Sequence, residues 1–232
     1  MANYAATRDR VEHYFDRTAT KTWERLTSDA PVSGVRATVR AGRDRMRALM
    51  LAQLPEDLRG ARILDAGCGT GAMAVELAQR GADVVAVDIS PALVGIAEKR
   101  MPANLAGQIA WVAGDMLDAT SGKFDHVVAM DSMIYYTSPD IAVVLGKASP
   151  RVNGKFVFTL PPRTPALMAM WRVGKLFPRA DRSPTMIPQT TAGVANALRE
   201  AGVKGRLSEI CLLYTSDAAD ENQRVGLAGG GG

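Results

Sequence analysis

The stretch ILDAGCGTGAMA, residues 63–74, combines a short apolar run, a glycine-rich turn and the start of a helix. Glycine lets the backbone turn tightly and lets a ligand approach it closely. The unpaired N–H groups at the beginning of the helix then face that ligand. As G-x-G-x-x-A the stretch would bind the pyrophosphate of a dinucleotide, whereas as D-x-G-x-G-x-G it would hold the amino-acid end of S-adenosylmethionine. The stretch alone leaves hydride transfer and methyl transfer open.

The acidic residue and the spacing of the glycines favour S-adenosylmethionine. Asp65 precedes the first glycine by two residues, where its carboxylate can order the loop and face the ammonium group of the ligand. The same carboxylate would be poorly placed beside a pyrophosphate, because two anions repel each other. Gly67, Gly69 and Gly71 alternate as the second pattern requires. The stretch therefore predicts a site for S-adenosylmethionine rather than for a dinucleotide.

Residues at the ends of the following apolar runs complete the candidate cofactor site. Asp88 ends VVAVD, about 20 residues beyond the glycines, where a carboxylate binds ribose hydroxyls. Its structural alternative is to cap the helix that begins after Ile89. Asp115 can accept a hydrogen bond from the adenine amino group, with the backbone of Met116 against the ring. Ile89, directly after Asp88, and Met130, at the end of the fourth run, are also assigned to this site.

Apolar runs alternate with helical patterns through most of the chain. DVVAVDI, residues 83–89, is the kind of run expected for a strand buried on both faces. PALVGIAEKRM, residues 91–101, is typical of a helix with proline in its first turn. The alternation predicts an α/β fold with a mostly parallel sheet and helices on both faces. Two further helices are predicted before it, over residues 4–27 and 34–52.

We predict three segments. Residues 1–52 form an N-terminal helical extension on the acceptor side, and residues 53–210 form the core, with a basic insertion at about 162–188. Residues 211–232 begin with CLLYTSDAADE, which resembles the translation of a transposon-end sequencing adapter. We expect this tail to be foreign to the natural protein and disordered or badly packed, with the natural chain continuing past Ile210 in another strand. The alternative is a genuine polar tail.

The formal net charge is +4, and the excess of Lys and Arg lies in residues 1–50. Such a segment can contact anionic lipid, nucleic acid or an acidic partner, or form a solvated helix face. No apolar run approaches the length of about 20 residues that spans a membrane, and no signal-peptide core is visible. The two cysteines imply no disulfide framework, so we predict a cytoplasmic protein.

Several stretches together carry a family resemblance. The glycine loop with its acidic residues resembles the class I, Rossmann-like methyltransferases that use S-adenosylmethionine. The wider set, from about residue 11 to residue 210, resembles the magnesium-protoporphyrin IX O-methyltransferases of chlorophyll and bacteriochlorophyll synthesis in photosynthesis. Its specific parts are VEHYFDRTATKTWERL (11–26), VRATVRAGRDRMRALML (35–51), MDSMIYYTSPD (130–140) and FTLPPRTPALMAMWRVGKLFPRADRSPT (158–185).

The resemblance implies transfer of a methyl group from S-adenosylmethionine to one propionate carboxylate of magnesium-protoporphyrin IX, which gives the monomethyl ester. It names two candidate contacts for the basic N-terminal segment: the porphyrin-binding subunit of magnesium chelatase, and the surface of the photosynthetic membrane. It implies no binding of nucleic acid.

A propionate is already ionised at pH 7, so the reaction needs no strong base. It needs the carboxylate to be desolvated and held in line with the methyl group, about 3 Å away. Tyr14 and Tyr135 are the candidate catalytic residues, as neutral hydrogen-bond donors, and Tyr136 is assigned to the substrate. Where this family often has LIHY, this sequence has a tyrosine, Tyr135, in place of the histidine. Its ordinary pKa of about 10 suits orientation rather than proton abstraction. The alternative is that these are half-buried aromatics.

The insertion matches a broad, flat, apolar substrate with acidic tails. Met168 and Trp171 would contact the face of the porphyrin, and Arg163 and Arg172 the propionate that is not methylated. A proline-bounded helix here would act as a lid. The alternative is that these side chains are helix packing and solvated charge. No metal site is predicted, and His126, within a strand, is assigned to packing.

Two other functions stay open at this point. The chain could methylate another small acceptor, such as a quinone or an organic acid, or it could be a scaffold that binds S-adenosylmethionine and a chelatase partner. The complete set of Asp65, Asp88 and Asp115 with the glycines argues against a site that has lost its activity.

Overall fold

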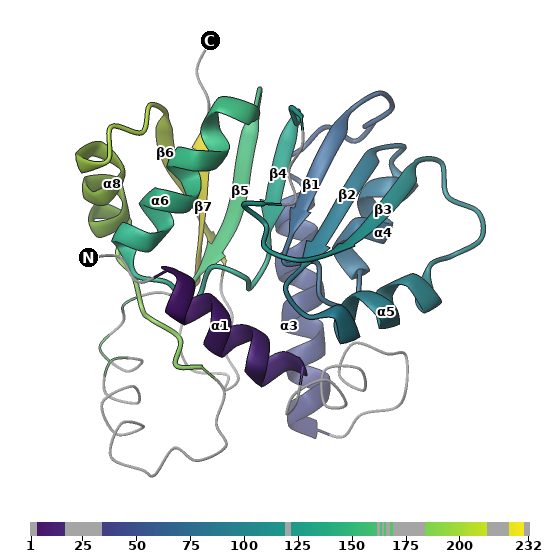
Figure 1. Cartoon of the computed structure of the whole chain (residues 1–232), viewed down its shortest axis with the longest axis horizontal. Helices are drawn as coiled ribbons and strands as arrows, with labels where there is room; N and C mark the ends of the chain where they lie inside the picture. The colour runs from purple at the N-terminus through teal and green to yellow at the C-terminus, as the bar shows by residue number, and fades with distance from the viewer. Residues whose placement is uncertain are drawn as a thin grey trace.

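The computed structural model describes residues 4–16, 34–118, 122–161, 163, 165, 168, 184–212 and 223–229. Within these residues a seven-stranded sheet has the strand order β3-β2-β1-β4-β5-β7-β6 (Figure 1). Strands β1 to β5 are parallel, and β7 is antiparallel to both β5 and β6. The predicted α/β fold with a mostly parallel sheet is thereby confirmed. The strands are β1 (Arg62–Ala66), β2 (Asp83–Asp88), β3 (Gln108–Ala113), β4 (His126–Ala129), β5 (Lys155–Leu160), β6 (Arg206–Leu212) and β7 (Gln223–Gly229).

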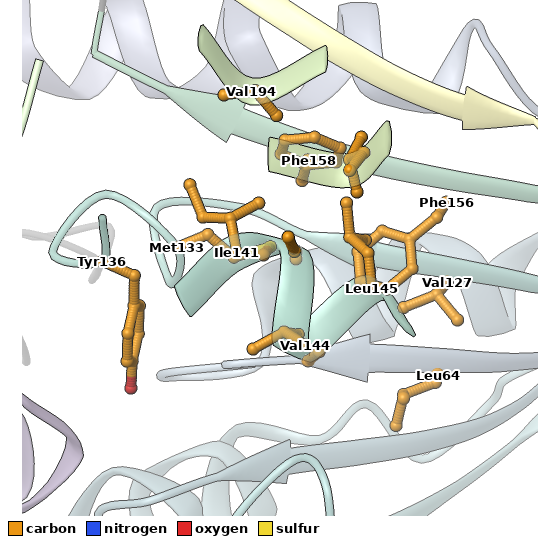
Figure 2. Packing of buried hydrophobic residues seen from close by; sticks show 14 of the residues in the cluster. Leu64, Val127, Met133, Tyr136, Ile141, Val144, Leu145, Phe156, Phe158 and Val194 are labelled. Atoms are coloured by element: carbon orange, nitrogen blue, oxygen red, sulfur yellow. The ribbon is translucent and has the colours of Figure 1, made fainter. Parts of the chain in front are cut away.

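Helices cover both faces of the sheet, because the strands present alternate residues to each side. Ile63 and Val128 lie in one buried cluster, which α3 and α4 complete. Leu64 and Val127, their neighbours in the chain, lie in the other cluster with α6 and α8 (Figure 2). A fully buried side chain such as Phe158 contributes about 1.5–3 kcal/mol. The helices are α1 (Tyr4–Tyr14), α3 (Gly34–Leu51), α4 (Ala72–Gln79), α5 (Pro91–Arg100), α6 (Ser138–Ala148) and α8 (Thr191–Glu200), with a 3-10 turn, η2 (Ser149–Arg151).

Local sequence sets where the helices begin. The hydroxyl oxygen of Ser90 accepts from the backbone N–H of Leu93, and Pro91 follows as the first residue of α5. Thr137 and Asp140 form a reciprocal capping box at the start of α6. These caps satisfy N–H groups that have no partner inside the helix. By contrast Gly71, the residue before α4, provides no side-chain cap, so the N–H groups in the first turn of α4 can bind other partners, such as the carboxylate of Asp65.

Both predicted N-terminal helices are present, and the first ends earlier than predicted. The helix predicted over residues 4–27 appears as α1, which ends at Tyr14, and residues 17–33 lie outside the described part of the chain. The helix predicted over 34–52 is confirmed as α3. Helix α1 crosses the edge of the sheet at which the parallel strands end (Figure 1). It is therefore placed over the site described below.

The C-terminal segment corrects one prediction. Residues 223–229, expected to be disordered or badly packed, form β7 and pair with β5 from Lys155–Gly229 to Leu160–Arg224. The physical reason is that a strand between β5 and β6 gives partners to the unpaired N–H and C=O groups of both. These ladders use the backbone and so depend only weakly on side-chain chemistry. That the segment is foreign to the natural protein stays a prediction.

No helix in the described ranges has the length and apolar character needed to cross a bilayer.

Candidate functional site

The glycine loop is held in a conformation that only glycine adopts without strain. Gly67 and Gly71 both have a φ of 86°. A Cβ atom at Gly67 would overlap the side chain of Ser132, and one at Gly71 would lie 2.6 Å from the Cη2 atom of Trp111. The backbone N–H groups of Gly67 and Cys68 donate to the carbonyl oxygen of Val87, at 2.7 and 2.9 Å. The loop is therefore packed closely against β2 and the end of β4.

Asp65, at the end of β1, is a buried carboxylate with incomplete pairing. Asp65 is only 1% exposed, and its Oδ2 atom has no hydrogen-bond partner among the described residues. Burial and, to a smaller extent, the charge of Asp88 together raise its pKa to about 7, against a hydrogen bond from the backbone of Ala74 that lowers it. A buried anion without a counter-charge is costly. Its environment therefore suits a cationic ligand.

Asp88, at the end of β2, is fixed by two backbone donors. The N–H of Gly69 donates to Oδ2 at 2.8 Å, and the N–H of Ser90 donates to Oδ1 at 2.9 Å. Burial raises the pKa of Asp88 to about 6, although these two hydrogen bonds lower it, and the charge of Asp16 also raises it. Asp88 thus orders the loop before α5, while the cap of α5 itself is Ser90. Each carboxylate oxygen can still accept a second hydrogen bond.

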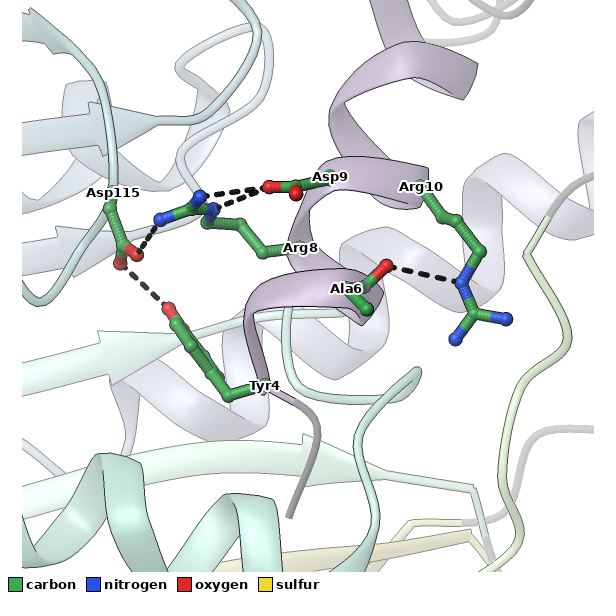
Figure 3. Close-up of polar contacts among 6 residues, drawn as sticks. All are labelled: Tyr4, Ala6, Arg8, Asp9, Arg10 and Asp115. Atoms are coloured by element: carbon green, nitrogen blue, oxygen red, sulfur yellow. Dashed lines mark hydrogen bonds and ion pairs between the residues drawn. The ribbon is translucent and has the colours of Figure 1, made fainter. Parts of the chain in front are cut away.

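Asp115, after β3, is reached by helix α1 (Figure 3). The phenol of Tyr4 donates to Oδ1 at 2.7 Å, and Nη1 of Arg8 donates to Oδ2 at 3.2 Å. The N–H of Leu117 donates to Oδ1 as well, at 2.8 Å. Burial and the bond to Asp115 raise the pKa of Tyr4. The carboxylate predicted to meet adenine therefore also anchors the N-terminal helix, which sequence reasoning did not foresee.

Aromatic side chains join α1 to the loop after β4. The rings of Tyr4 and Tyr136 are stacked with centroids 5.0 Å apart, and Phe15 meets Tyr135 edge-on at 6.4 Å. Tyr14 is half-buried and packs edge-on against Phe15 at 5.2 Å. Burial raises the pKa of Tyr136, whose ring lies in the core cluster (Figure 2). In this arrangement the Tyr136 ring packs with the core and with Tyr4, and its contact with the substrate stays a prediction.

Asp131 and Arg43 were missed by sequence reasoning. Asp131, directly after Met130, has a φ of 57° and forms an ion pair with Arg43 of α3. Its N–H donates to the hydroxyl oxygen of Thr159 at 2.8 Å. The signal was available, because an acidic residue after a buried strand is the feature that identified Asp65 and Asp88.

The other predicted cofactor residues lie at the same edge. Ile89 is half-buried next to Asp88, Met130 is buried at the end of β4, and Met116 packs against the core cluster shared with α6. Cys68 is buried, and burial raises the pKa of its thiol, which does not suit a nucleophile. His126 accepts from the N–H of Lys155 at 3.1 Å on Nδ1, which confirms its structural role.

The insertion after β5 leaves and rejoins the fold at one place. The N–H of Arg163 donates to the carbonyl oxygen of Gln189 at 3.1 Å, and the N–H of Gln189 donates to that of Pro161 at 2.9 Å. The Gln189 side chain donates to the carbonyl oxygen of Tyr136 at 3.0 Å. Arg163 is exposed and Met168 half-buried. The predicted substrate contacts at residues 171 and 172 lie outside the described residues.

Comparisons with known proteins bear on this site. Residues 129–220 match a family described as the magnesium-protoporphyrin IX methyltransferase C-terminus, and residues 63–152 match a methyltransferase domain. The chain is 60% identical over 188 residues to the magnesium-protoporphyrin O-methyltransferase of Rhodobacter capsulatus, covering 81% of this chain and 84% of the relative. It is 29% identical over 198 residues to the chloroplastic magnesium protoporphyrin IX methyltransferase of Arabidopsis thaliana, covering 84% of this chain and 64% of that one.

A solved structure supports the fold. The crystal structure of magnesium protoporphyrin IX methyltransferase from Synechocystis PCC 6803 with bound SAH superposes with a TM-score of 0.74 at 24% sequence identity. The alignment covers 94% of this chain and 97% of that chain.

Proposed function

Because the chain belongs to the magnesium-protoporphyrin O-methyltransferase family, we propose that it transfers a methyl group from S-adenosylmethionine to a propionate carboxylate of magnesium-protoporphyrin IX. The product is the monomethyl ester of the (bacterio)chlorophyll pathway. The observation that carries the proposal is the buried Asp65 carboxylate beside the glycine loop, with one oxygen unpartnered among the described residues. The donor brings an ammonium group and a sulfonium, so it offers the counter-charge that this carboxylate lacks.

Three acidic residues divide the cofactor between them in this proposal. Asp65 faces the ammonium group, Asp88 accepts from the ribose hydroxyls, and Asp115 accepts from the adenine amino group beside the backbone of Met116. The carboxylates of Asp65 and Asp88 are buried, and that of Asp88 is held by two backbone N–H groups. This supports their roles, because preorganised acceptors lose little entropy when a ligand binds. For Asp115, adenine has to share or replace the bonds from Tyr4 and Arg8.

The acceptor side needs positioning rather than a base. The sulfonium supplies an electrophilic methyl group, and the ionised propionate oxygen forms the new O–C bond as the S–C bond breaks. Tyr135 and Tyr14 orient that carboxylate as neutral donors, and the aromatic cluster around Phe15 excludes water from it. Arg163, Met168, Trp171 and Arg172 are proposed to hold the rest of the porphyrin.

The basic N-terminal segment is proposed to contact either the porphyrin-binding subunit of magnesium chelatase or the membrane surface, at the periphery of the photosynthetic membrane. Its support is the excess of Arg on α3, where Arg45 is exposed. Electrostatic attraction of this kind weakens as salt is added.

The direct test incubates the full chain with S-adenosylmethionine and magnesium-protoporphyrin IX and follows the monomethyl ester by chromatography. We expect a product that carries one methyl group from the donor. A quinol and metal-free protoporphyrin serve as comparison acceptors. Absence of the ester together with methylation of the quinol would overturn the proposal.

A further inference from the structure

Gln189 lies between two segments that the proposed function assigns to the acceptor. One is the loop after β4, residues 130–137, which carries Tyr135. The other is the insertion after β5, near whose start Arg163 lies. Gln189 is only 8% exposed, so its polar groups need partners inside the protein. Those partners connect the two segments.

The side-chain amide of Gln189 is held at both of its ends. Nε2 donates to the carbonyl oxygen of Tyr136 at 3.0 Å, and Oε1 accepts from the hydroxyl of Ser138, the first residue of α6, at 2.5 Å. A carbonyl oxygen can only accept, so Tyr136 fixes which way the amide points. An ionised glutamate of the same shape could accept from Ser138 but could not donate to Tyr136. The position therefore requires the amide.

A backbone hydrogen bond beside Gln189 repeats this attachment. The N–H of Ile187 donates to the carbonyl oxygen of Ile134 at 2.8 Å. The carbonyl groups of Ile134 and Tyr136 are thus both bound by residues 187–189. Tyr135, which is buried, lies between them in the chain. The backbone on both sides of Tyr135 is therefore held, and this limits the rotamers that its side chain can adopt.

The backbone of Gln189 holds the two ends of the insertion at the same time. Its N–H donates to the carbonyl oxygen of Pro161 at 2.9 Å, and its carbonyl oxygen accepts from the N–H of Arg163 at 3.1 Å. Arg163 is exposed, and its side chain is proposed to contact the propionate that is not methylated. One residue thus connects the segment assigned to this propionate with the segment assigned to the methylated one.

We propose that Gln189 is a positioning residue for the acceptor, which sets the separation of Tyr135 and Arg163 so that both propionates of the porphyrin are bound together. The propionates are attached to a rigid ring, so a preorganised pair of contacts at a matching separation favours binding. This inference rests on the proposed function for the identity of the acceptor. Within the described residues, the hydrogen bonds of Gln189 involve none of the acidic residues assigned to the cofactor, which are Asp65, Asp88 and Asp115.

The test replaces the amide by a carboxyl group of the same shape. At pH 8 the ionised carboxyl in Gln189→Glu places an oxygen against the carbonyl oxygen of Tyr136 and cannot donate to it. We expect the Kd of magnesium-protoporphyrin IX to rise about tenfold, measured by absorbance titration of the full chain with bound S-adenosylhomocysteine. The Kd of S-adenosylmethionine, measured by calorimetry, should stay within about twofold of the parent value. Ser138→Ala tests the same connection without an added charge and should raise the porphyrin Kd about threefold.

The pH dependence separates positioning from damage to the fold. The introduced carboxyl is buried and faces a carbonyl oxygen, and both conditions raise its pKa. Once protonated it can donate again, so the ratio of the porphyrin Kd in Gln189→Glu to that in the parent should fall from pH 8 to pH 6. Gln108→Glu is the matched control, because Gln108 is exposed at the start of β3, the end of the strand away from the site. Its porphyrin Kd should equal that of the parent at both pH values.

Unchanged porphyrin affinity in Ser138→Ala, with or without a loss in Gln189→Glu, would overturn this inference and leave the proposed function standing. Equal losses of porphyrin and cofactor affinity would also overturn it, because Gln189 would then support the fold as a whole. Selective loss of porphyrin affinity in both variants of a chain that forms no ester would support the inference and overturn the proposed function instead.

Discussion

Replacement of Asp65 by asparagine should weaken cofactor binding and reduce the loss of folding stability at alkaline pH. Burial raises the pKa of Asp65 to about 7 in the folded chain, against an ordinary value of 3.8. The folded state therefore holds a proton that the unfolded chain has lost. The stabilisation from this proton is complete below pH 3.8 and disappears as the pH rises through 7.

The size of this effect on the free energy of unfolding follows from the pH range in which the folded and unfolded states differ in protonation. Between pH 5 and pH 7 the unfolded chain is ionised at this position while folded Asp65 keeps its proton. At about 1.4 kcal/mol per pH unit, this one side chain lowers the free energy of unfolding by about 2–3 kcal/mol over that range. Asparagine is neutral at every pH and lacks this contribution. The loss of stability from pH 5 to pH 8 should therefore be smaller by about 2–3 kcal/mol in Asp65→Asn.

Urea unfolding at pH 5 and pH 8, followed by tryptophan fluorescence, measures the difference. Asp57→Asn is the control, because Asp57 is exposed and its hydrogen bonds with Arg59 lower its pKa to about 2, so it stays ionised throughout. Cofactor affinity at pH 8, measured in parallel, should fall in Asp65→Asn only. A variant that keeps the pH dependence of the parent protein would refute the reasoning, since Asp65 would then not be the titrating group.

Four further variants test the rest of the site. Gly67→Ala should lower the free energy of unfolding, measured in urea, by about 2–4 kcal/mol, because the new methyl group meets Ser132 and φ is positive. Gly69→Ala, which also has a positive φ but open space around it, should lower it by about 1 kcal/mol. Equal losses for the two variants would contradict the packing described. Asp88→Ala should weaken cofactor binding about tenfold or more in calorimetry, and an unchanged affinity would reduce Asp88 to a role in loop order. Tyr135→Phe should lower kcat about tenfold without a matching change in cofactor affinity, and a neutral result would make this tyrosine a bystander.

The parts of the site that lie close together in the sequence could be predicted from it. The glycine loop needs positive φ angles at fixed spacing, so Gly67 and Gly71 were identifiable from residue type alone. Asp65 and Asp88 follow buried parallel strands, whose ends meet at one edge of the sheet. The same rule would have identified Asp131, had it been applied to the end of β4.

Contacts between distant segments were beyond sequence reasoning. Tyr4 and Arg8 reach Asp115 across more than a hundred residues, and no spacing rule links a helix surface to a particular strand end. The ion pair of Arg43 with Asp131 has the same character. Strand β7 was missed for a different reason: its pairing is driven by the open edges of its neighbours and not by its own composition.

The two backbone hydrogen bonds of Gln189 have a consequence for how the acceptor specificity of such an enzyme can change. The backbone hydrogen bonds of Gln189 with Pro161 and Arg163 hold the two ends of the insertion together. Lengthening a segment whose two ends are held together costs little free energy, because the entropy of loop closure grows only slowly with loop length. The segment can thus be exchanged as a cassette while the sheet and the donor site stay as they are. With the acceptor-binding role proposed above for this segment, a new acceptor would require replacement of the segment rather than redesign of the fold.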